Sequence, residues 1–370
     1  MRVLVVGGGI GGLSTTIALR QRDVDVDVLE INPKWDVYGV GIIQPGNAIR
    51  ALDTLGLAEK AVAQGYAMKG SRFLDSDGNL LGEVPPLDLL GPKYPPMNGI
   101  TRPRLHALFQ EAVGASGANV RLGVTVDEVG EDGRVTLSDG TAGAYDLVVG
   151  ADGIHSTVRG LVFSDAPKPE YTGQIVWRYN VPRPEGLETL DVFVGSNGKC
   201  GFVPLAPDLM YIFYIEAVPP EQVKMADDQL ASIMRERLHE FGGPVAEIRD
   251  RYITDADKVV VRPVESLLVP RPWHRGRVVL VGDSAHATSP HVGQGGAMAM
   301  EDAVVLAEEV TQGDVDAALM RFMERRYPRC REIWEISRQI GVWEIEHTPP
   351  PEADFVGLTM KSVHATAVPV

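Results

Sequence analysis

The sequence predicts an α/β protein in which a discontinuous domain with a parallel β-sheet carries an inserted, mostly antiparallel sheet. Three observations predict this fold. The chain opens with a run of β-formers, Arg2–Val6, that leads through a glycine-rich turn into a helical pattern. The middle of the chain, from about Tyr171 to Ala217, consists of strand patterns separated by turns. Two long helical patterns, Gly295–Glu309 and Val315–Arg338, then complete the fold.

The 370 residues divide into two predicted domains and a tail. At roughly 150 residues per domain, this length suits two domains, each large enough for its own core. The first domain is discontinuous and carries the C-terminal helices, and the second is the inserted sheet domain. The predicted boundaries are residues 1–72, 98–170 and 261–340 for the first domain, 73–97 and 171–260 for the second, and 341–370 for an irregular C-terminal tail without periodicity.

Composition and charge exclude several classes of protein. Hydrophobic residues make up 44% and charged residues 23%, the balance of a globular protein. The net charge of −15 argues against nucleic-acid binding, because an acidic surface repels phosphate. Cys200 and Cys330 are too few for a disulfide framework or a cysteine zinc site. No apolar run approaches the ~20 residues that cross a bilayer. We therefore expect a cytoplasmic protein without nucleic-acid, membrane or metal partners.

A glycine-rich turn follows the first predicted strand. Gly7, Gly9 and Gly12 fit the pattern Gly-x-Gly-x-x-Gly. In this context the first glycine allows a tight turn, the second admits a pyrophosphate, and the third lets helix and strand pack closely. Glu30 ends the second predicted strand, where its carboxylate can accept hydrogen bonds from ribose hydroxyls. These features predict a Rossmann-like dinucleotide-binding domain, but they do not decide between NAD and FAD.

Two further motifs follow later strands. The second motif of the chain, Asp146–Arg159, contains Asp152 in an Asp-Gly turn. The third motif, Arg277–Asp302, contains Asp283 at a strand end and a glycine-rich stretch, Gly293–Gly296, that opens a helix. Asp283 can accept hydrogen bonds from ligand hydroxyls. The glycines can bring backbone N–H groups against a flat ring, with the positive end of the helix directed at it.

With these three motifs in this order, the sequence resembles the FAD-dependent aromatic hydroxylases, single-component flavoprotein monooxygenases with the p-hydroxybenzoate hydroxylase fold. The resemblance covers about residues 1–340. It implies that the glycine turn meets the ADP half of FAD and that Asp283 meets the ribityl chain. Arg102, in Thr-Arg-Pro-Arg-Leu, resembles the family's arginine near the pyrophosphate. The cofactor-binding residues predicted in this way are Gly7, Gly9, Gly12, Glu30, Arg102, Asp152, Asp283, Gly293, Gly295 and Gly296.

The resemblance also implies the reaction. NADH or NADPH reduces the bound FAD, and the reduced flavin reacts with O₂ to give a C4a-hydroperoxide. A small aromatic or heteroaromatic substrate then attacks the distal oxygen and is hydroxylated. The protein is expected to be a monomer or a homodimer. The alternatives are a same-fold epoxidase or Baeyer–Villiger-type monooxygenase, and a non-enzymatic prenyl-protein binder on this scaffold, although such binders lack the Gly282-Asp283 loop.

Three residues are predicted to act on the substrate: His291, Tyr214 and Arg178. His291 follows Pro290 on the loop that would edge the flavin, and an imidazole that titrates near neutral pH can deprotonate a ring hydroxyl. The alternative is a solvent-facing loop histidine. Arg178 belongs to a Trp-Arg pair that resembles an element common in the family, and Tyr214 lies in the predicted sheet.

The sequence leaves open which face of the inserted sheet meets the substrate. Because side chains alternate along a strand, Tyr211 and Phe213 share one face and Tyr214 takes the other. Two histidines within the motifs, His155 and His286, are interpreted as structural, and His106 is expected to be an ordinary, partly exposed residue.

Overall fold

The structure is a computed structural model that describes residues 1–37, 39–85, 87–346 and 355–370. Its first domain contains a six-stranded sheet in the order β18-β19-β12-β1-β2-β8. All neighbouring strands pair in parallel except β18, which is antiparallel to β19. The strands are β1 (Arg2–Val6), β2 (Asp25–Glu30), β8 (Asn119–Leu122), β12 (Leu147–Gly150), β18 (His274–Arg275) and β19 (Val278–Leu280). The central strands are buried on both faces, which explains their continuous apolar runs.

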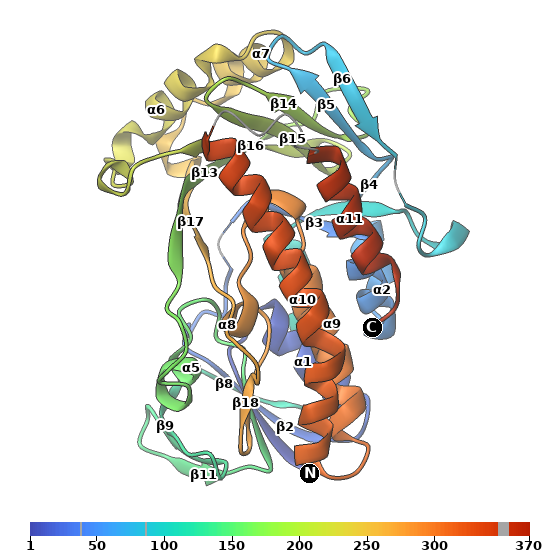
Figure 1. The fold of residues 1–370 in the computed structure, drawn as a ribbon, viewed down its shortest axis with the longest axis vertical. Coiled ribbons are helices and arrows are strands. Elements are labelled where there is room, and N and C mark those ends of the chain that lie inside the picture. Colours follow the sequence, from blue (N-terminus) through green and yellow to red (C-terminus); the bar gives the residue numbers. More distant parts are fainter. Residues whose placement is uncertain (38, 86, 347–354) are drawn as a thin grey trace.

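Helices cover this sheet and carry the motifs. α1 (Ile10–Arg20) packs against α9 (Gly295–Val310). α4 (Arg102–Ala115) begins where the Thr101 hydroxyl accepts a hydrogen bond from the Arg104 N–H, with proline in its first turn. The short helix α5 (Thr157–Val162) begins at the end of the second motif, and α8 (Asp283–His286) and η6 (Pro290–Val292) lie within the third. A small sheet of β9 (Val126–Val129), β10 (Arg134–Leu137) and β11 (Ala142–Ala144) lies at the far end of this domain (Figure 1).

A seven-stranded sheet in the order β17-β13-β16-β15-β14-β5-β6 forms the second domain. Its strands are antiparallel, except that β14 pairs in parallel with β5. They span Ser71–Asp75 (β5), Leu80–Val84 (β6), Glu170–Pro182 (β13), Leu190–Val194 (β14), Gly198–Ala206 (β15), Leu209–Ala217 (β16) and Val260–Ser266 (β17). α6 (Leu230–Arg237) and α7 (Gly243–Tyr252) cover the outer face (Figure 1).

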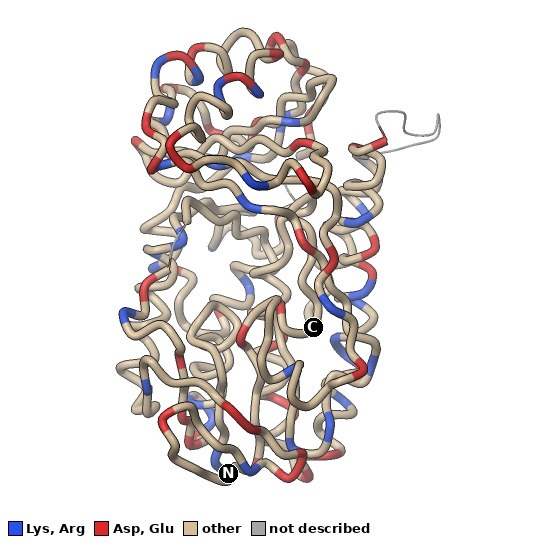
Figure 2. The backbone as a smooth tube through the Cα atoms, turned by 90° about the vertical axis from the view of Figure 1, so that its left-hand side faces the viewer, with Lys and Arg blue, Asp and Glu red and all other residues tan. Residues whose placement is uncertain are grey.

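The inner face of this sheet looks toward the first domain. A three-stranded sheet of β3 (Gly41–Pro45), β4 (Tyr66–Met68) and β7 (Met97–Thr101) contacts β15 there. α2 (Gly46–Thr54) and α3 (Ala58–Ala63) follow β3. Basic and acidic residues are interspersed along the backbone of both domains (Figure 2).

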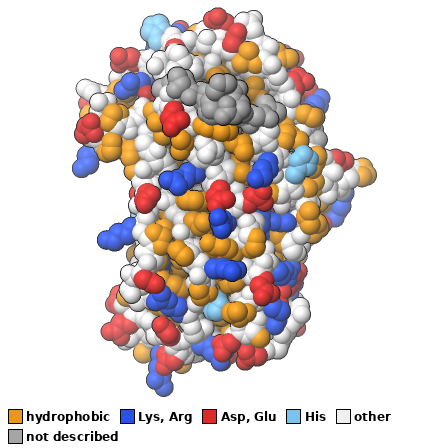
Figure 3. All heavy atoms as spheres, in the orientation of Figure 1, with side chains coloured by type: hydrophobic (Ala, Val, Ile, Leu, Met, Phe, Trp, Pro, Cys, Tyr) orange, Lys and Arg blue, Asp and Glu red, His pale blue; other side chains and the backbone are white. Residues whose placement is uncertain are grey.

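The long helix α10 (Val315–Glu346) runs from the first domain up to the inserted sheet (Figure 1). The irregular tail predicted for 341–370 is wrong for two of its parts. α10 continues to Glu346, and residues 355–367 form a further helix, α11 (Phe355–Ala367), that packs on α10 and α2. The prolines at 349–351 lie outside the described residues. Basic and acidic side chains mix over the face that these helices form (Figure 3).

The helix α11 forms because its surroundings supply partners that local sequence does not reveal. Arg50 of α2 donates hydrogen bonds to the carbonyl oxygens of Thr366 and Ala367, both at 2.9 Å. Arg329 of α10 donates to the carbonyl of Val368. These cations meet the negative end of the helix dipole. Among the described residues, no helix combines the length and the apolar character needed to cross a bilayer.

Candidate active site

The three sequence motifs meet at one edge of the parallel sheet. Because β2, β1, β12 and β19 are parallel neighbours, their carboxyl ends lie side by side. Glu30 ends β2, the glycine turn follows β1, Asp152 follows β12 and Asp283 follows β19. In open α/β sheets, ligands bind in the crevice outside these strand ends. The fold therefore brings together residues that are up to 276 positions apart in the chain, the separation of Gly7 and Asp283.

The glycines of the first motif have different roles in the turn. Gly7 has φ +112°, and a Cβ added there would lie 2.4 Å from the carbonyl oxygen of Ala151. A Cβ at Gly12 would lie 1.9 Å from the carbonyl oxygen of Gly7. Gly9 differs, because a Cβ there would meet no described atom within 4 Å. The turn therefore leaves open space beside Gly9, next to the N–H groups that begin α1, and an anion can bind at such a place.

Glu30 braces the same turn. One carboxylate oxygen accepts a hydrogen bond from the Gly8 N–H and the other from the Asn32 N–H, both at 2.7 Å. Each oxygen retains a second lone pair that a ligand hydroxyl can use. The structure thus adds a role in holding the loop to the ribose contact predicted from the sequence.

Trp35 and His106 also hold the turn, through the carbonyl oxygen of Gly8, and sequence reasoning missed both roles. The indole N–H of Trp35 donates to the Gly8 carbonyl at 3.1 Å, and His106 Nε2 lies 2.9 Å from the same oxygen. His106 was expected to be partly exposed, which is wrong, because the residue is only 4% exposed. Its position one turn after Arg102 on α4 was the only sequence signal.

Asp152 serves its own loop. Its carboxylate accepts hydrogen bonds from the Ser156 hydroxyl at 2.5 Å and from the N–H groups of Thr157 and Val158 at 2.7 and 3.1 Å. It therefore caps α5, although burial raises its pKa. Arg159 donates to the carbonyl oxygens of Ile154 and Ser284 and so ties the second motif to the third.

Asp283 begins α8, directly after β19 at this edge of the parallel sheet. Protein atoms surround its carboxylate closely, yet the residue remains accessible to solvent. Burial raises its pKa, and the positive charges of His286 and Arg102 lower it in part. Within the described part of the chain, no hydrogen bond or ion pair engages this carboxylate. An accessible carboxylate without a protein partner can accept hydrogen bonds from the hydroxyl groups of a ligand.

A buried ionic network positions the helix α9 behind Asp283. Asp302 accepts hydrogen bonds from the Gly282 N–H at 2.8 Å, from His286 at 2.6 Å and from Arg326 at 2.7 Å. Although burial raises the pKa of Asp302, His286 and Arg326 lower it to about 2. The carboxylate is therefore ionised, and it holds the start of α8 against α9.

Three members of this network could in principle bind a metal. His286, Asp302 and Cys330 place ligand atoms within 4.8 Å of one another. The guanidinium of Arg326 occupies the middle of this group, 2.7 Å from Asp302 and 3.4 Å from the Cys330 sulfur. A cation already neutralises the cluster, so ion pairs account for its arrangement.

Arg178 and Tyr211 lie on the inner face of the seven-stranded sheet, opposite the core that contains Trp177 and Tyr214. Burial and the positive charges of Arg102 and Arg262 lower the pKa of Arg178, but an arginine of ordinary pKa above 12 keeps its proton. No hydrogen bond or ion pair of Arg178 is found among the described residues. Tyr211 is 6% exposed and lies near both Arg178 and Arg102. Arg102 itself donates to the Gly41 carbonyl at 3.4 Å.

Tyr214 lies on the opposite face of the sheet. It is 1% exposed and packs edge-on against Phe241, with ring centroids 5.9 Å apart, in the core beneath α6 and α7. Trp177 is buried in the same core. The prediction that Tyr214 acts on the substrate therefore disagrees with the structure, because side-chain alternation turns it away from the inner face of the sheet, on which Tyr211 lies.

The side chain of His291 is completely buried against α10. Its Nδ1 lies 2.8 Å from the Ser289 hydroxyl, and its Nε2 lies 3.2 Å from a carboxylate oxygen of Glu344. Burial lowers its pKa, while Glu344 acts to raise it. Nδ1 therefore has a hydroxyl partner, whereas Nε2 is buried beside Glu344 without a hydrogen bond, and both nitrogens are enclosed by protein rather than facing solvent.

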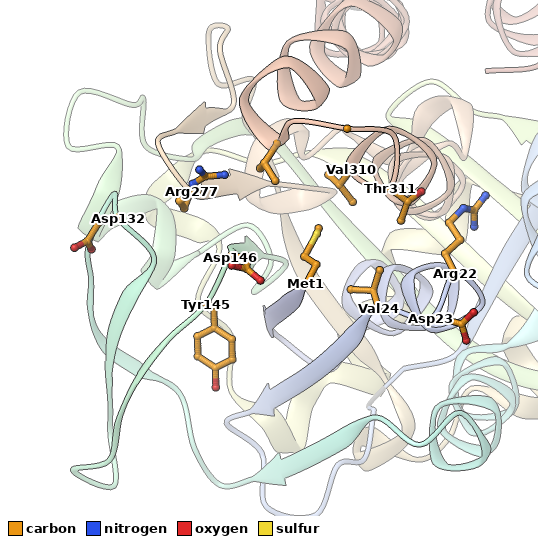
Figure 4. A pocket seen from close by; sticks show the side chains of 12 residues that line it. Met1, Arg22, Asp23, Val24, Asp132, Tyr145, Asp146, Arg277, Val310 and Thr311 are labelled. Atoms are coloured by element: carbon orange, nitrogen blue, oxygen red, sulfur yellow. The ribbon is translucent and has the colours of Figure 1, made fainter.

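A separate hollow of about 550 Å³ lies at the other end of the parallel sheet (Figure 4). Its lining includes Met1, Val24, Asp146 and Arg277, each of which directly precedes a strand of that sheet. Asp146 and Arg277 are the first residues of the second and third motifs, but the lining of this hollow includes none of the residues predicted to bind the cofactor. The hollow therefore lies at the amino ends of the strands and is not part of the candidate site.

Comparisons with known proteins show the family to which this chain belongs. The family described as "FAD binding domain" matches residues 1–334. The 2-heptyl-3-hydroxy-4(1H)-quinolone synthase of Pseudomonas aeruginosa is 33% identical over 93% of this chain and 90% of its own length. Aurachin C monooxygenase/isomerase of Stigmatella aurantiaca is also 33% identical, over 93% and 90%. HpxO of Klebsiella pneumoniae, solved with FAD and uric acid, has a TM-score of 0.84 at 26% identity, covering 99% of this chain and 92% of that one.

The fold and the motifs at one sheet edge define a flavin-binding protein of the α/β class with an inserted sheet domain. Within that class, the chain belongs to the FAD-dependent aromatic hydroxylases, and it is an FAD-dependent monooxygenase, as the sequence predicted.

Proposed function

We propose that this protein uses NADH or NADPH to reduce bound FAD and hydroxylates a small aromatic or heteroaromatic compound that carries an anionic or strongly polar oxygen. The observation that carries the proposal is a pair of charged side chains that have no hydrogen bond or ion pair among the described residues, Asp283 after β19 and Arg178 on β13, with Arg102 near both of them. Relatives support a ring substrate, since one was solved with uric acid and another is named for a hydroxyquinolone.

The residues at the sheet edge fit FAD. The open space at Gly9 and the start of α1 suit the pyrophosphate, and Glu30 suits the adenosine ribose. Asp283 suits the ribityl hydroxyls, and Gly293–Gly296 with the start of α9 suit the edge of the ring. When bound, FAD supplies the hydride acceptor and the activation of O₂. Arg102 and Asp152 act in this proposal by shaping the loops around it.

The inner face of the sheet supplies the substrate wall. Val176, Phe213 and Ile215 give it an apolar surface. Arg178 and Tyr211 add a cation and a phenol, the few polar groups that orient a ring in an apolar pocket. A charged guanidinium without a protein partner is stabilised by an oxygen anion of the substrate. The protein thus orients the ring and excludes water, and the transferred oxygen comes from O₂.

The function is tested with purified protein, ¹⁸O₂ and a panel of ring compounds. We expect bound FAD, nicotinamide oxidation that the correct compound stimulates, and a product that carries one ¹⁸O atom. Protein that retains no FAD on reconstitution would overturn the proposal, and so would a product whose new oxygen comes from water. An epoxide or a ring-expanded lactone among the products would instead assign the alternative oxygen insertions.

Arg178→Met is expected to weaken substrate capture while FAD content stays unchanged. Methionine keeps part of the apolar stem but removes the charge. The loss of one charge-assisted hydrogen bond costs about 1.5–3 kcal/mol, or roughly 10- to 150-fold in kcat/KM. Steady-state kinetics with the identified substrate measure this loss. Arg235→Met on the outer helix α6 is the matched control, and equal kinetics in the two variants would remove Arg178 from the substrate site.

A further inference from the structure

One face of α10 holds the loop that leads into the cofactor-facing helix α9. Ser337, Gly341 and Glu344 are spaced four and three residues apart, so they lie on one face of the helix. The Ser337 hydroxyl donates to the Ser289 carbonyl at 2.8 Å and also lies 2.8 Å from the Ser289 hydroxyl. A Cβ at Gly341 would lie 2.9 Å from Cε1 of His291. The glycine therefore lets the helix approach the imidazole closely.

The third residue of this face, Glu344, connects the loop to the inserted sheet. Lys199 of β15 lies 2.6 Å from one of its carboxylate oxygens. Gln174 of β13 donates to the other oxygen at 3.3 Å, and His291 lies 3.2 Å from it. One carboxylate thus joins α10, the seven-stranded sheet and η6, three parts that are distant in sequence.

The environment makes this carboxylate a strong ionic link. The side chains of Lys199 and Glu344 are 17% and 19% exposed, so solvent screens the pair only partly. Burial alone raises the pKa of Glu344, but Lys199 and His291 lower it to about 2. A cavity of about 150 Å³ beside the cluster is lined by Gln174, Ser289, His291 and Trp334, among others. This space gives the loop room to move if the link is broken.

We propose that Glu344 is a positioning residue. Paired with Lys199, it holds residues 288–293 against the inserted sheet. It thereby fixes the position of the cofactor-facing glycines relative to the inner face of that sheet. The inference rests on the proposed function for its catalytic consequence. In this proposal, His291 packs between Glu344 and Ser289 and does not act as a base on the substrate. The loop is then aligned from the sheet domain, on which the substrate wall also lies.

Hydrogen exchange of the FAD-loaded full chain tests the link without measuring activity. Lys199→Met and Glu344→Gln should each speed amide exchange in peptides covering 288–296 by about 5- to 30-fold. The double variant should match the single variants, because one ion pair is lost in each case. Lys199→Arg should restore slow exchange. Lys69→Met is the control, since Lys69 pairs with Glu188 at the same 2.6 Å on the surface.

The catalytic arm measures product formed per nicotinamide oxidised, together with the FAD dissociation constant. Product yield should fall in Lys199→Met and Glu344→Gln while FAD binding stays at the wild-type value. Unchanged exchange at 288–296 would overturn the proposal, and so would an increase spread over the whole chain or reproduced by Lys69→Met. A wild-type protein that forms no product would refute the proposed function alone, because the exchange result stands independently of it.

Discussion

Arg326→Met is expected to cause the largest loss of stability of any single side-chain change in the first domain. Arg326 is fully buried and bonds Asp302 at 2.7 Å, Glu301 at 2.9 Å and the Met298 carbonyl at 3.2 Å. Removing it leaves two buried carboxylates short of positive charge. Breaking one partner of a buried ionic network costs about 3–5 kcal/mol. Urea unfolding of the FAD-free protein measures this change in the free energy of unfolding.

Arg331→Met on the same helix is the matched control. Arg331 pairs with Glu335 at 2.7 Å, but both side chains are more than half exposed. Solvent screens such an exposed pair, so it contributes little and this variant should unfold almost as the wild type does. If Arg326→Met unfolded at the same urea concentration as Arg331→Met, the network would not be what holds α8 against α9.

Gly9→Ala is expected to reduce FAD binding without reducing stability. Gly9 has φ −85° and ψ −170°, a conformation that alanine adopts, and the added Cβ would meet no described atom within 4 Å. The methyl group would instead occupy the space proposed for the pyrophosphate. We expect the FAD dissociation constant to rise about 10- to 100-fold, equal to 1.4–2.8 kcal/mol, with unfolding of the FAD-free protein unchanged. Fluorescence titration with FAD measures the first quantity.

Gly12→Ala provides the contrast within the same turn. Its Cβ would lie 1.9 Å from the Gly7 carbonyl oxygen, so the turn itself must deform. This variant should lose both FAD binding and stability. A Gly9→Ala protein that binds FAD with wild-type affinity would show that the pyrophosphate does not approach this side of the turn.

Local sequence patterns predicted the parts of the fold that depend on interactions between residues close together in the chain. The apolar run of β1, the glycine turn and the helix after it form a unit whose spacing follows from backbone geometry. Helix α7 was not predicted, although Pro244 in its first turn is a common start signal. Helix α11 was predicted as irregular because its stabilising partners, Arg50 and Arg329, are on other helices.

Some residues of the candidate site could likewise be identified from the sequence, and others could not. The glycine motif, Glu30 and Asp283 could be identified from sequence, because each follows a strand and parallel strands end at one edge. The role of His106 could not, since its partner Gly8 is 98 residues away. Because side chains alternate along a strand, the sequence placed Tyr211 and Tyr214 on opposite faces of the sheet. Only the packing of α6 and α7 on one face decided which of the two residues turns inward.

The sequence by itself therefore determined the class of fold and the residues that follow each strand, because these depend on local spacing and on the shared direction of parallel strands. The cofactor followed from the resemblance of its three motifs to a known family. The tertiary structure alone decided the partners of side chains. It turned His291 from a predicted base into a buried group between Ser289 and Glu344, and it left Arg178 unpaired among the described residues, on the inner face of the seven-stranded sheet. The physical reason is that burial and charge pairing depend on surfaces that meet only when distant segments pack together.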